Sequence, residues 1–301
     1  MEIAIEMPKV SVIIPTFNRA QQVIRAVDSV FNQDWKDFEI IVVDDGSTDD
    51  TGNALSRYVD LIRYVRQPIN RGVSSARNIG VKTSMAPWVA FLDSDDYWLT
   101  EKLRVQMEFV ELNPQVVACQ TEEKWMRNGV QVNPKRKHKK PSGNIFKQSL
   151  KLCLVSPSCV MLKRSLIEEV GLFDEALPAA EDFDLWLRIS CRYPIFLINK
   201  RLVVKEGGHE DQLSRRIIGI DKYRITAIVK VIRSGVLSSD QAQQAMKELS
   251  VKCRIYGKGC IKRGRTEEGY FYLSLTEKLA NSEEILYYKK RGGDLIAEDC
   301  S

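Results

Sequence analysis

The chain has 301 residues, a formal net charge of +5, and shares of apolar and charged residues that are ordinary for a globular protein. This length allows one large α/β domain with an appendage, and the small net charge gives no argument for nucleic-acid binding. The 7 cysteines include no Cys-x-x-Cys pair, so neither a cysteine-based metal site nor a disulfide framework is predicted.

The expected location rests on two features that the sequence lacks. The N-terminus has no basic region followed by an apolar core, so no signal peptide is expected, and no apolar run approaches the roughly 18 residues of a membrane span. Cysteines without a disulfide framework favour a reducing compartment. A cytoplasmic protein is therefore expected, and peripheral contact with the inner face of a membrane stays open.

Strands and helices are expected to alternate through the first part of the chain. Apolar runs predict strands at 10–14, 38–43, 61–65 and 88–92, and one-sided apolar spacing predicts helices at 20–31 and around 76–80. Asn18 is expected to cap the first helix, and Ser47 with Asp50 resembles a capping box for another. This alternation predicts a doubly wound, mainly parallel α/β sheet flanked by helices.

The second part of the chain is less regular. The expected elements are a helix at 103–110, strands at 116–119, 158–162, 195–198 and 202–204, and a helix that begins at Glu181. A loop is expected at 207–210. The basic run 135–140 is expected to be a solvated loop, or alternatively a patch facing an anionic acceptor or membrane.

The C-terminal part is expected to be helical. Apolar spacing predicts helices at 220–232, 239–251, 254–262 and 267–279. We therefore divide the chain into an α/β domain at 8–214 and a helical C-terminal region at 215–301. A homodimer formed through this helical region stays open.

Three carboxylates follow the predicted strand at 88–92. They are Asp93, Asp95 and Asp96. In an open α/β sheet, ligands bind beyond the carboxyl ends of the strands. Clustered like charges need a compensating cation, and hard divalent cations prefer carboxylate oxygens while keeping positions open for phosphate. The alternative is a polar turn with Asp as a helix N-cap, and an Asp-x-Asp triplet does not decide between the two.

Other polar groups are expected at the same rim of the sheet. The turn 16–18, Asp45 and the turn and helix at 70–78 all follow predicted strands. Asp45 is suited to accept a hydrogen bond from a ribose hydroxyl or a base imide, and Arg77 is suited to a base carbonyl or a phosphate. Asp95 and Asp96 are suited to a metal that bridges a diphosphate.

Several other kinds of site are excluded by their missing motifs. The sequence has no G-x-x-x-x-G-K-[ST] loop for ordinary ATPase chemistry and no G-x-G-x-x-G after a strand for dinucleotide binding. It has no G-x-S-x-G nucleophile elbow. The segment that starts at Asp45 resembles the beginning of an EF-hand loop, but it lacks the central Gly and the final Glu.

Four segments, taken together and in order, resemble glycosyltransferase family 2. They read VSVIIPTFNR, VVDDGSTD, NRGVSSARNIG and FLDSDD, and they have the order and spacing of that family. The resemblance covers roughly residues 8–215 and leaves the helical region outside. It implies the GT-A fold of the nucleotide-diphospho-sugar transferases, with a C-terminal helical appendage.

The resemblance also implies roles for the matching positions. The implied nucleotide-binding residues are Pro15, Thr16, Asn18, Asp45, Arg77, Asn78, Asp93 and Ser94. The implied metal-binding residues are Asp93, Asp95, Asp96 and His209. The implied catalytic pair is Glu181 and Asp182, with Asp182 as the base.

The family implies an inverting transfer of a sugar from a nucleoside-diphosphate sugar, most often a UDP-sugar, to a hydroxyl of a saccharide, lipid-linked or other acceptor. Mn²⁺ or Mg²⁺ would neutralise the departing diphosphate, and a carboxylate would take the acceptor's proton. Such enzymes assemble bacterial-type surface polysaccharide, lipopolysaccharide or glycolipid.

Two alternatives remain beside this reading. One is a nucleotidyltransferase of the same superfamily, which would need a glycine-rich basic loop where this chain has 15–18. The other is a nucleotide-sugar-binding scaffold, against which the intact Glu181 and Asp182 pair argues.

Overall fold

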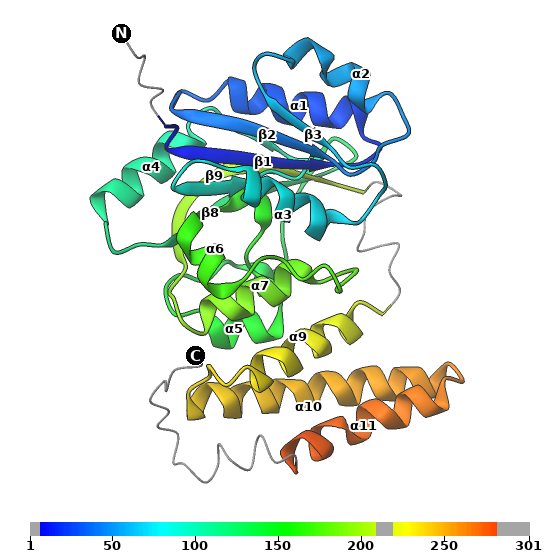
Figure 1. Ribbon diagram of the computed structural model, residues 1–301. Coiled ribbons are helices and arrows are strands. Elements are labelled where there is room, and N and C mark those ends of the chain that lie inside the picture. The colour runs from blue at the N-terminus through cyan, green and yellow to red at the C-terminus, as the bar shows by residue number, and fades with distance from the viewer. Residues whose placement is uncertain (1–6, 209–218, 282–301) are drawn as a thin grey trace, which may run out of the picture.

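The computed structural model describes residues 7–208 and 219–281, which form a sheet domain followed by helices (Figure 1). The strands are β1 (Val10–Thr16), β2 (Phe38–Asp44), β3 (Arg63–Arg66), β4 (Trp88–Phe91), β5 (Tyr97–Trp98), β6 (Ala118–Arg127), β7 (Val130–Val132), β8 (Val160–Lys163) and β9 (Phe196–Gly207). They form one sheet in the order β3-β2-β1-β4-β8-β6-β9-β5, and β7 pairs with the outer part of β6.

The first four strands form the parallel, doubly wound half of the sheet that the sequence predicts. β1 lies between β2 and β4 and pairs with both in parallel. Every residue of β1 is buried, as expected for a strand covered on both faces. Pro15 lies past the last β1 residue that pairs with β4, so its missing N–H does not interrupt that ladder.

The helices of the sheet domain lie on both sides of the sheet. They are α1 (Ala20–Phe31), α2 (Thr51–Leu55), α3 (Val73–Thr83), α4 (Lys102–Leu112), α5 (Phe146–Lys151), α6 (Arg164–Val170) and α7 (Glu181–Ser190). Alternate residues of β1 point to opposite faces. Val12 and Ile14 pack in the cluster that contains α1, whereas Ile13 packs in the cluster that contains α6, α7 and Val81 of α3.

The second half of the sheet is mixed rather than parallel. β8 runs antiparallel to both β4 and β6, and β9 runs parallel to β6. The two short strands predicted at 195–198 and 202–204 are wrong, because β9 is one strand. Its register against β6 shifts on either side of Glu122, and the exposed residues 199–201 lie at this bulge.

The C-terminal region is helical, as predicted. It contains α9 (Asp221–Arg233), α10 (Ser239–Lys262) and α11 (Thr266–Ala280). The prediction of two separate helices at 239–251 and 254–262 is wrong, because α10 is continuous through residues 251–254, where no Gly or Pro interrupts it. α9 packs on α7, and α10 packs on α5 (Figure 1). The boundary placed at 214–215 falls outside the described residues and stays a prediction.

Two predicted helix caps are also wrong. Arg19, not Asn18, precedes α1, and Asn18 has a positive φ of 51°. Asp50, not Ser47, precedes α2, and it makes no side-chain cap. Among the described residues, no helix is both long and apolar enough to cross a membrane.

Candidate functional site

The candidate site is built around Arg77, which α3 carries in its second turn. Its guanidinium donates to Glu181 Oε1 at 2.8 Å and to Asp93 Oδ1 at 2.7 Å. Arg77 is only 3% exposed, and its charged partners raise its pKa against the opposing effect of burial. One buried cation therefore joins the carboxyl end of β4 to the start of α7, which are far apart in the sequence.

The turn after β4 carries the predicted acidic triplet, but its three carboxylates have different surroundings. Asp93 faces Arg77, and although burial raises its pKa, the charges of Arg77 and Lys205 hold the pKa below its usual range. Asp95 pairs with Arg19 at 2.7 Å, and the two side chains are only 15% and 18% exposed. Asp96 is buried and accepts hydrogen bonds from the Ser158 hydroxyl and the Glu206 N–H, and burial raises its pKa well above its usual value.

Sequence reasoning missed a cation beside this turn. Lys205 of β9 donates to Ser156 Oγ at 3.1 Å. The negative charges of Glu123, Asp96 and Asp93 raise its pKa against the opposing effect of burial. Lys205 therefore offsets part of the acidic charge at the rim. A lysine within an alternating strand pattern gives no local signal of such a role.

The basic run 135–140 is not uniformly solvated. Residues 135–137 and 139 are exposed, but Lys140 is buried and pairs with Glu123 at 3.0 Å. Lys140 and Lys205 lower the pKa of Glu123 to about 2, against the opposing effect of burial. Lys140 therefore belongs to the charged layer beneath the site.

The loop after β2 is fixed by Asp45. Asp45 accepts hydrogen bonds from Gln67 Nε2 at 2.6 Å and from the backbone N–H groups of Arg71 and Gly72, both at 2.8 Å. Burial raises the pKa of Asp45 although these N–H groups lower it. Asp45 therefore holds the turn that leads into α3, and about one of its roughly four acceptor positions stays available.

The end of β1 contacts the same loop. Asn18 Oδ1 accepts from the Thr48 N–H at 2.7 Å, and the Asn18 N–H donates to Ser47 Oγ at 2.9 Å. With its positive φ, Asn18 directs its side chain to the loop after β2 and does not cap α1. The Thr16 hydroxyl is buried without a hydrogen-bond partner among the described residues. Such a group calls for an external partner.

The other predicted positions lie close by. Asn78, one residue beyond Arg77, donates to the Phe173 carbonyl at 2.9 Å and accepts from the Phe173 N–H at 2.9 Å, so it fixes the segment before α7. Pro15 and Ser94 are buried at the ends of β1 and β4. His209 lies outside the described residues.

The start of α7 brings two carboxylates to this rim. Glu181 is buried against Arg77, and burial together with the Asp182 charge raises its pKa. Asp182 is partly exposed, and the Cys153 thiol donates to its Oδ2 at 3.3 Å. Burial and the Asp182 charge raise the pKa of Cys153 well above its usual value, so the thiol keeps its proton. Sequence reasoning missed Cys153, because nothing in its own neighbourhood marks it.

The donor set fits a divalent cation held partly by a substrate. Among the described residues, no group of three or more His, Cys, Asp or Glu side chains is arranged to hold a metal ion. Mg²⁺ is often bound by only one or two carboxylates together with substrate phosphates. Asp93 and Asp95 offer such hard oxygen ligands, and each now contacts an arginine that balances its charge.

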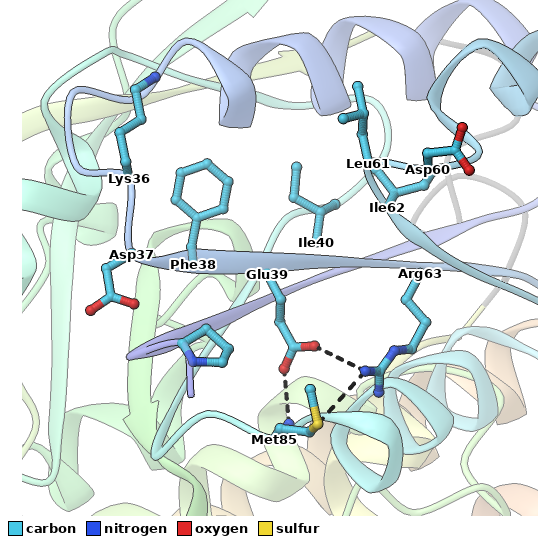
Figure 2. Close-up of a pocket in the computed structure, with 11 residues that line it drawn as sticks. Lys36, Asp37, Phe38, Glu39, Ile40, Asp60, Leu61, Ile62, Arg63 and Met85 are labelled. Atoms are coloured by element: carbon cyan, nitrogen blue, oxygen red, sulfur yellow. Dashed lines mark hydrogen bonds and ion pairs between the residues drawn. The ribbon is translucent and has the colours of Figure 1, made fainter. Parts of the chain in front are cut away.

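A separate pocket lies at the other edge of the sheet. Figure 2 shows this pocket, of about 830 Å³, beside the amino ends of β2 and β3, where Phe38, Glu39 and Arg63 line it. Ligands of open α/β sheets bind at the carboxyl ends of the strands. The pocket is therefore not part of the candidate site.

Known proteins resemble this chain in sequence. The model of a family described as glycosyl transferase family 2 matches residues 11–171. An uncharacterized glycosyltransferase of Rickettsia felis is 37% identical over 73% of this chain and 37% of its own length. The Escherichia coli protein WfaP, named as a UDP-Glc:α-D-GlcNAc-diphosphoundecaprenol β-1,3-glucosyltransferase, is 32% identical over 61% of this chain and 70% of its own length. The chain thus spans little more than a third of the length of the first curated relatives that it matches.

Solved structures share the fold. Staphylococcus aureus TarS 1–349 in complex with UDP-GlcNAc superposes with a TM-score of 0.65 at 18% identity, covering 90% of this chain and 92% of that one. A Pyrobaculum calidifontis mannosyltransferase in complex with GDP-Man and Mn²⁺ has a TM-score of 0.58 at 19% identity, covering 91% and 87%. The predicted GT-A architecture with a helical C-terminal region is therefore confirmed.

Proposed function

This chain belongs to glycosyltransferase family 2, and from that premise we propose that it transfers a sugar, with inversion, from a nucleoside-diphosphate sugar to an acceptor hydroxyl. The observation that carries the proposal is the bridge made by Arg77. It contacts Asp93 of the Asp-x-Asp turn at 2.7 Å and Glu181, the residue before Asp182, at 2.8 Å. A donor's diphosphate and an acceptor's hydroxyl need these two groups side by side.

Asp182 is the proposed catalytic base. Glu181 is committed to Arg77, whereas Asp182 is partly exposed and is held by the Cys153 thiol. A carboxylate that takes the acceptor's proton raises the nucleophilicity of the attacking oxygen. Ala180, in a left-handed conformation with φ of 60°, sets the turn that presents Asp182 at the first turn of α7.

The nucleotide would lie along the ends of β1, β2 and α3. The buried Thr16 hydroxyl lacks a protein partner among the described residues, and Asp45 keeps an acceptor position. Pro15, Asn18, Asn78 and Ser94 stay further proposed nucleotide-binding residues. A UDP-sugar is the proposed donor, in line with the ligand named for TarS and the donor named for WfaP.

Asp93 and Asp95 would hold Mn²⁺ or Mg²⁺ against the diphosphate, with His209 as a further proposed ligand. When bound, the cation would neutralise charge on the leaving diphosphate. Asp96 is a poorer candidate than the sequence suggested, because its carboxylate is buried and already accepts two hydrogen bonds. For Asp95 to bind the cation, it would have to leave Arg19, with which it forms a largely buried ion pair.

The proposed acceptor is a lipid-linked saccharide of surface polysaccharide assembly, and the proposed location is the cytoplasm, at the inner face of a membrane. The acceptors named for WfaP and for a Campylobacter jejuni relative support this, since both contain diphosphoundecaprenol or PP-undecaprenol. A homodimer through the helical region remains a prediction.

The test is transfer measured from labelled UDP-sugars to a lipid-linked acceptor, with donor affinity measured in parallel. Asp182→Asn should lower kcat by about 10²–10⁴-fold and leave donor affinity unchanged, because the base acts on the acceptor. The matched control is Asp240→Asn, which removes a first-turn acid from α10. Full transfer by Asp182→Asn would remove Asp182 from the mechanism.

A further inference from the structure

One face of α10 carries a line of basic side chains. Arg254, Lys258 and Lys262 are each four residues apart, so they lie along one side of the helix, and all three are exposed. We call these three residues the α10 basic face. The segment from 254 to 265 contains no Asp or Glu, and it also contains Arg263 and Arg265 in the turn that follows α10. Arg265 is balanced by Glu268 of α11, at 3.0 Å.

Nothing in the described part of the chain balances this face. The ion pair within α10 joins Lys252 to Glu248, and Lys252 points to the sheet domain, where its ammonium donates to the Lys151 carbonyl at 3.0 Å. None of the three basic side chains has an acidic partner among the described residues. Like charges four residues apart repel and destabilise a helix. An anionic partner would remove this repulsion.

An exposed apolar residue accompanies the basic face. Ile255 directly follows Arg254 on α10 and is 63% exposed. Helices that lie on a membrane combine Lys and Arg with exposed aliphatic and aromatic side chains. Nucleic acid or an acidic protein would match the charge but would leave Ile255 without a suitable environment.

In Figure 1 the carboxyl-terminal end of α10 lies on the same side of the molecule as the carboxyl ends of β1 and β2. A contact at this end is compatible with an acceptor held in a membrane, and this step alone rests on the proposed lipid-linked acceptor.

We propose that the α10 basic face, with Ile255 and Arg263, docks this protein on the anionic headgroups of a phospholipid bilayer. The charges give attraction at a distance, and Ile255 inserts at the interface. This contact is peripheral, reversible and weakened by salt, because screening shortens the reach of exposed charges.

The experiment is co-sedimentation of the full chain with vesicles, at low and at physiological salt. Vesicles of phosphatidylglycerol and phosphatidylcholine should bind the protein, and vesicles of phosphatidylcholine alone should not. Arg254→Gln/Lys258→Gln/Lys262→Gln should weaken binding on the order of 100-fold, because each basic residue near an anionic surface contributes about 5-fold. The matched control, Lys36→Gln/Lys82→Gln/Lys200→Gln, removes the same charge from exposed positions of the sheet domain and should leave binding unchanged.

Thermal melts of both variants establish that they fold. Equal binding to neutral vesicles, an unaffected basic-face variant, or an equal loss in the control would each overturn the proposal. So would tighter binding to a DNA duplex than to anionic vesicles at the same salt. The vesicle experiment needs no sugar donor, so a failure to bind vesicles is distinct from a failure of the proposed sugar transfer. Donor binding, measured on the same variants, reports on the proposed transfer separately.

Discussion

Arg77→Met tests the electrostatic centre of the site. Arg77 is the buried cation between Asp93 and Glu181, with contacts of 2.7 and 2.8 Å. Methionine fills a similar volume but leaves both carboxylates without their cation. Removing one partner of a buried ion pair destabilises proteins by about 3–5 kcal/mol. The Asp93 side chain keeps 24% exposure, and Glu181 only 9%, so most of this loss should come from Glu181.

At roughly 2–4 °C per kcal/mol, the expected fall in Tm is about 6–20 °C. The loss should depend on pH in a definite direction. In the variant the two carboxylates resist ionisation, so their folded pKa values rise above the unfolded ones, and destabilisation appears only as pH increases past about 4. Adding Glu181→Gln to Arg77→Met should recover part of the loss at neutral pH.

The assay is thermal or denaturant unfolding of wild type, both single variants and the double variant, between pH 4 and 8. A loss below about 1 kcal/mol in Arg77→Met, well under the 3–5 kcal/mol expected, would refute the reasoning. So would a loss that is the same at every pH. Two independent, additive losses would also show that Arg77 and Glu181 are not coupled.

Two further substitutions test the packing and the buried charges. Gly80→Ala should lower the free energy of unfolding by about 1–3 kcal/mol, because the new Cβ would overlap Ile13 Cγ2 where α3 crosses β1, and this outweighs the helix preference of alanine. The control is Gly259→Ala, whose Cβ meets only the flexible end of Arg263 and should not lower the Tm. Equal effects of the two substitutions would contradict this prediction. Burial lowers the pKa of Lys102 to about 7, so between about pH 7 and 10 the unfolded chain binds more protons and wild-type stability rises with pH. Lys102→Met should flatten this rise in chemical denaturation curves, and an unchanged slope would argue that Lys102 is not the group responsible.

The parallel half of the sheet could be predicted because each of its strands is marked by a pattern of neighbouring residues in the sequence. Continuous apolar runs such as 88–92, separated by short polar turns, leave few alternatives to a buried strand. The positions of Asp45 and Asp93 at the rim follow from the same pattern. Their partners could not be read, because Arg77 and Glu181 are 104 residues apart in sequence and meet only through tertiary packing.

The errors have physical causes as well. Asn18 has the side chain of a helix cap, but a positive φ turns it toward Thr48 instead. β9 appeared to be two strands because the polar residues at its bulge interrupt the apolar alternation. Lys205 and Cys153 were missed since a single lysine or cysteine has no pattern of its own, and their importance depends on what packs against them.

The most direct test of the account is donor binding, measured by thermal shift across a panel of nucleotide sugars with and without Mn²⁺. One nucleoside-diphosphate sugar at about 100 times its Kd should raise the free energy of unfolding by about 2.7 kcal/mol, and Asp95→Ala should remove the Mn²⁺-dependent part. If no nucleotide sugar stabilises the protein under either condition, the strand-end site does not hold a donor and the account fails.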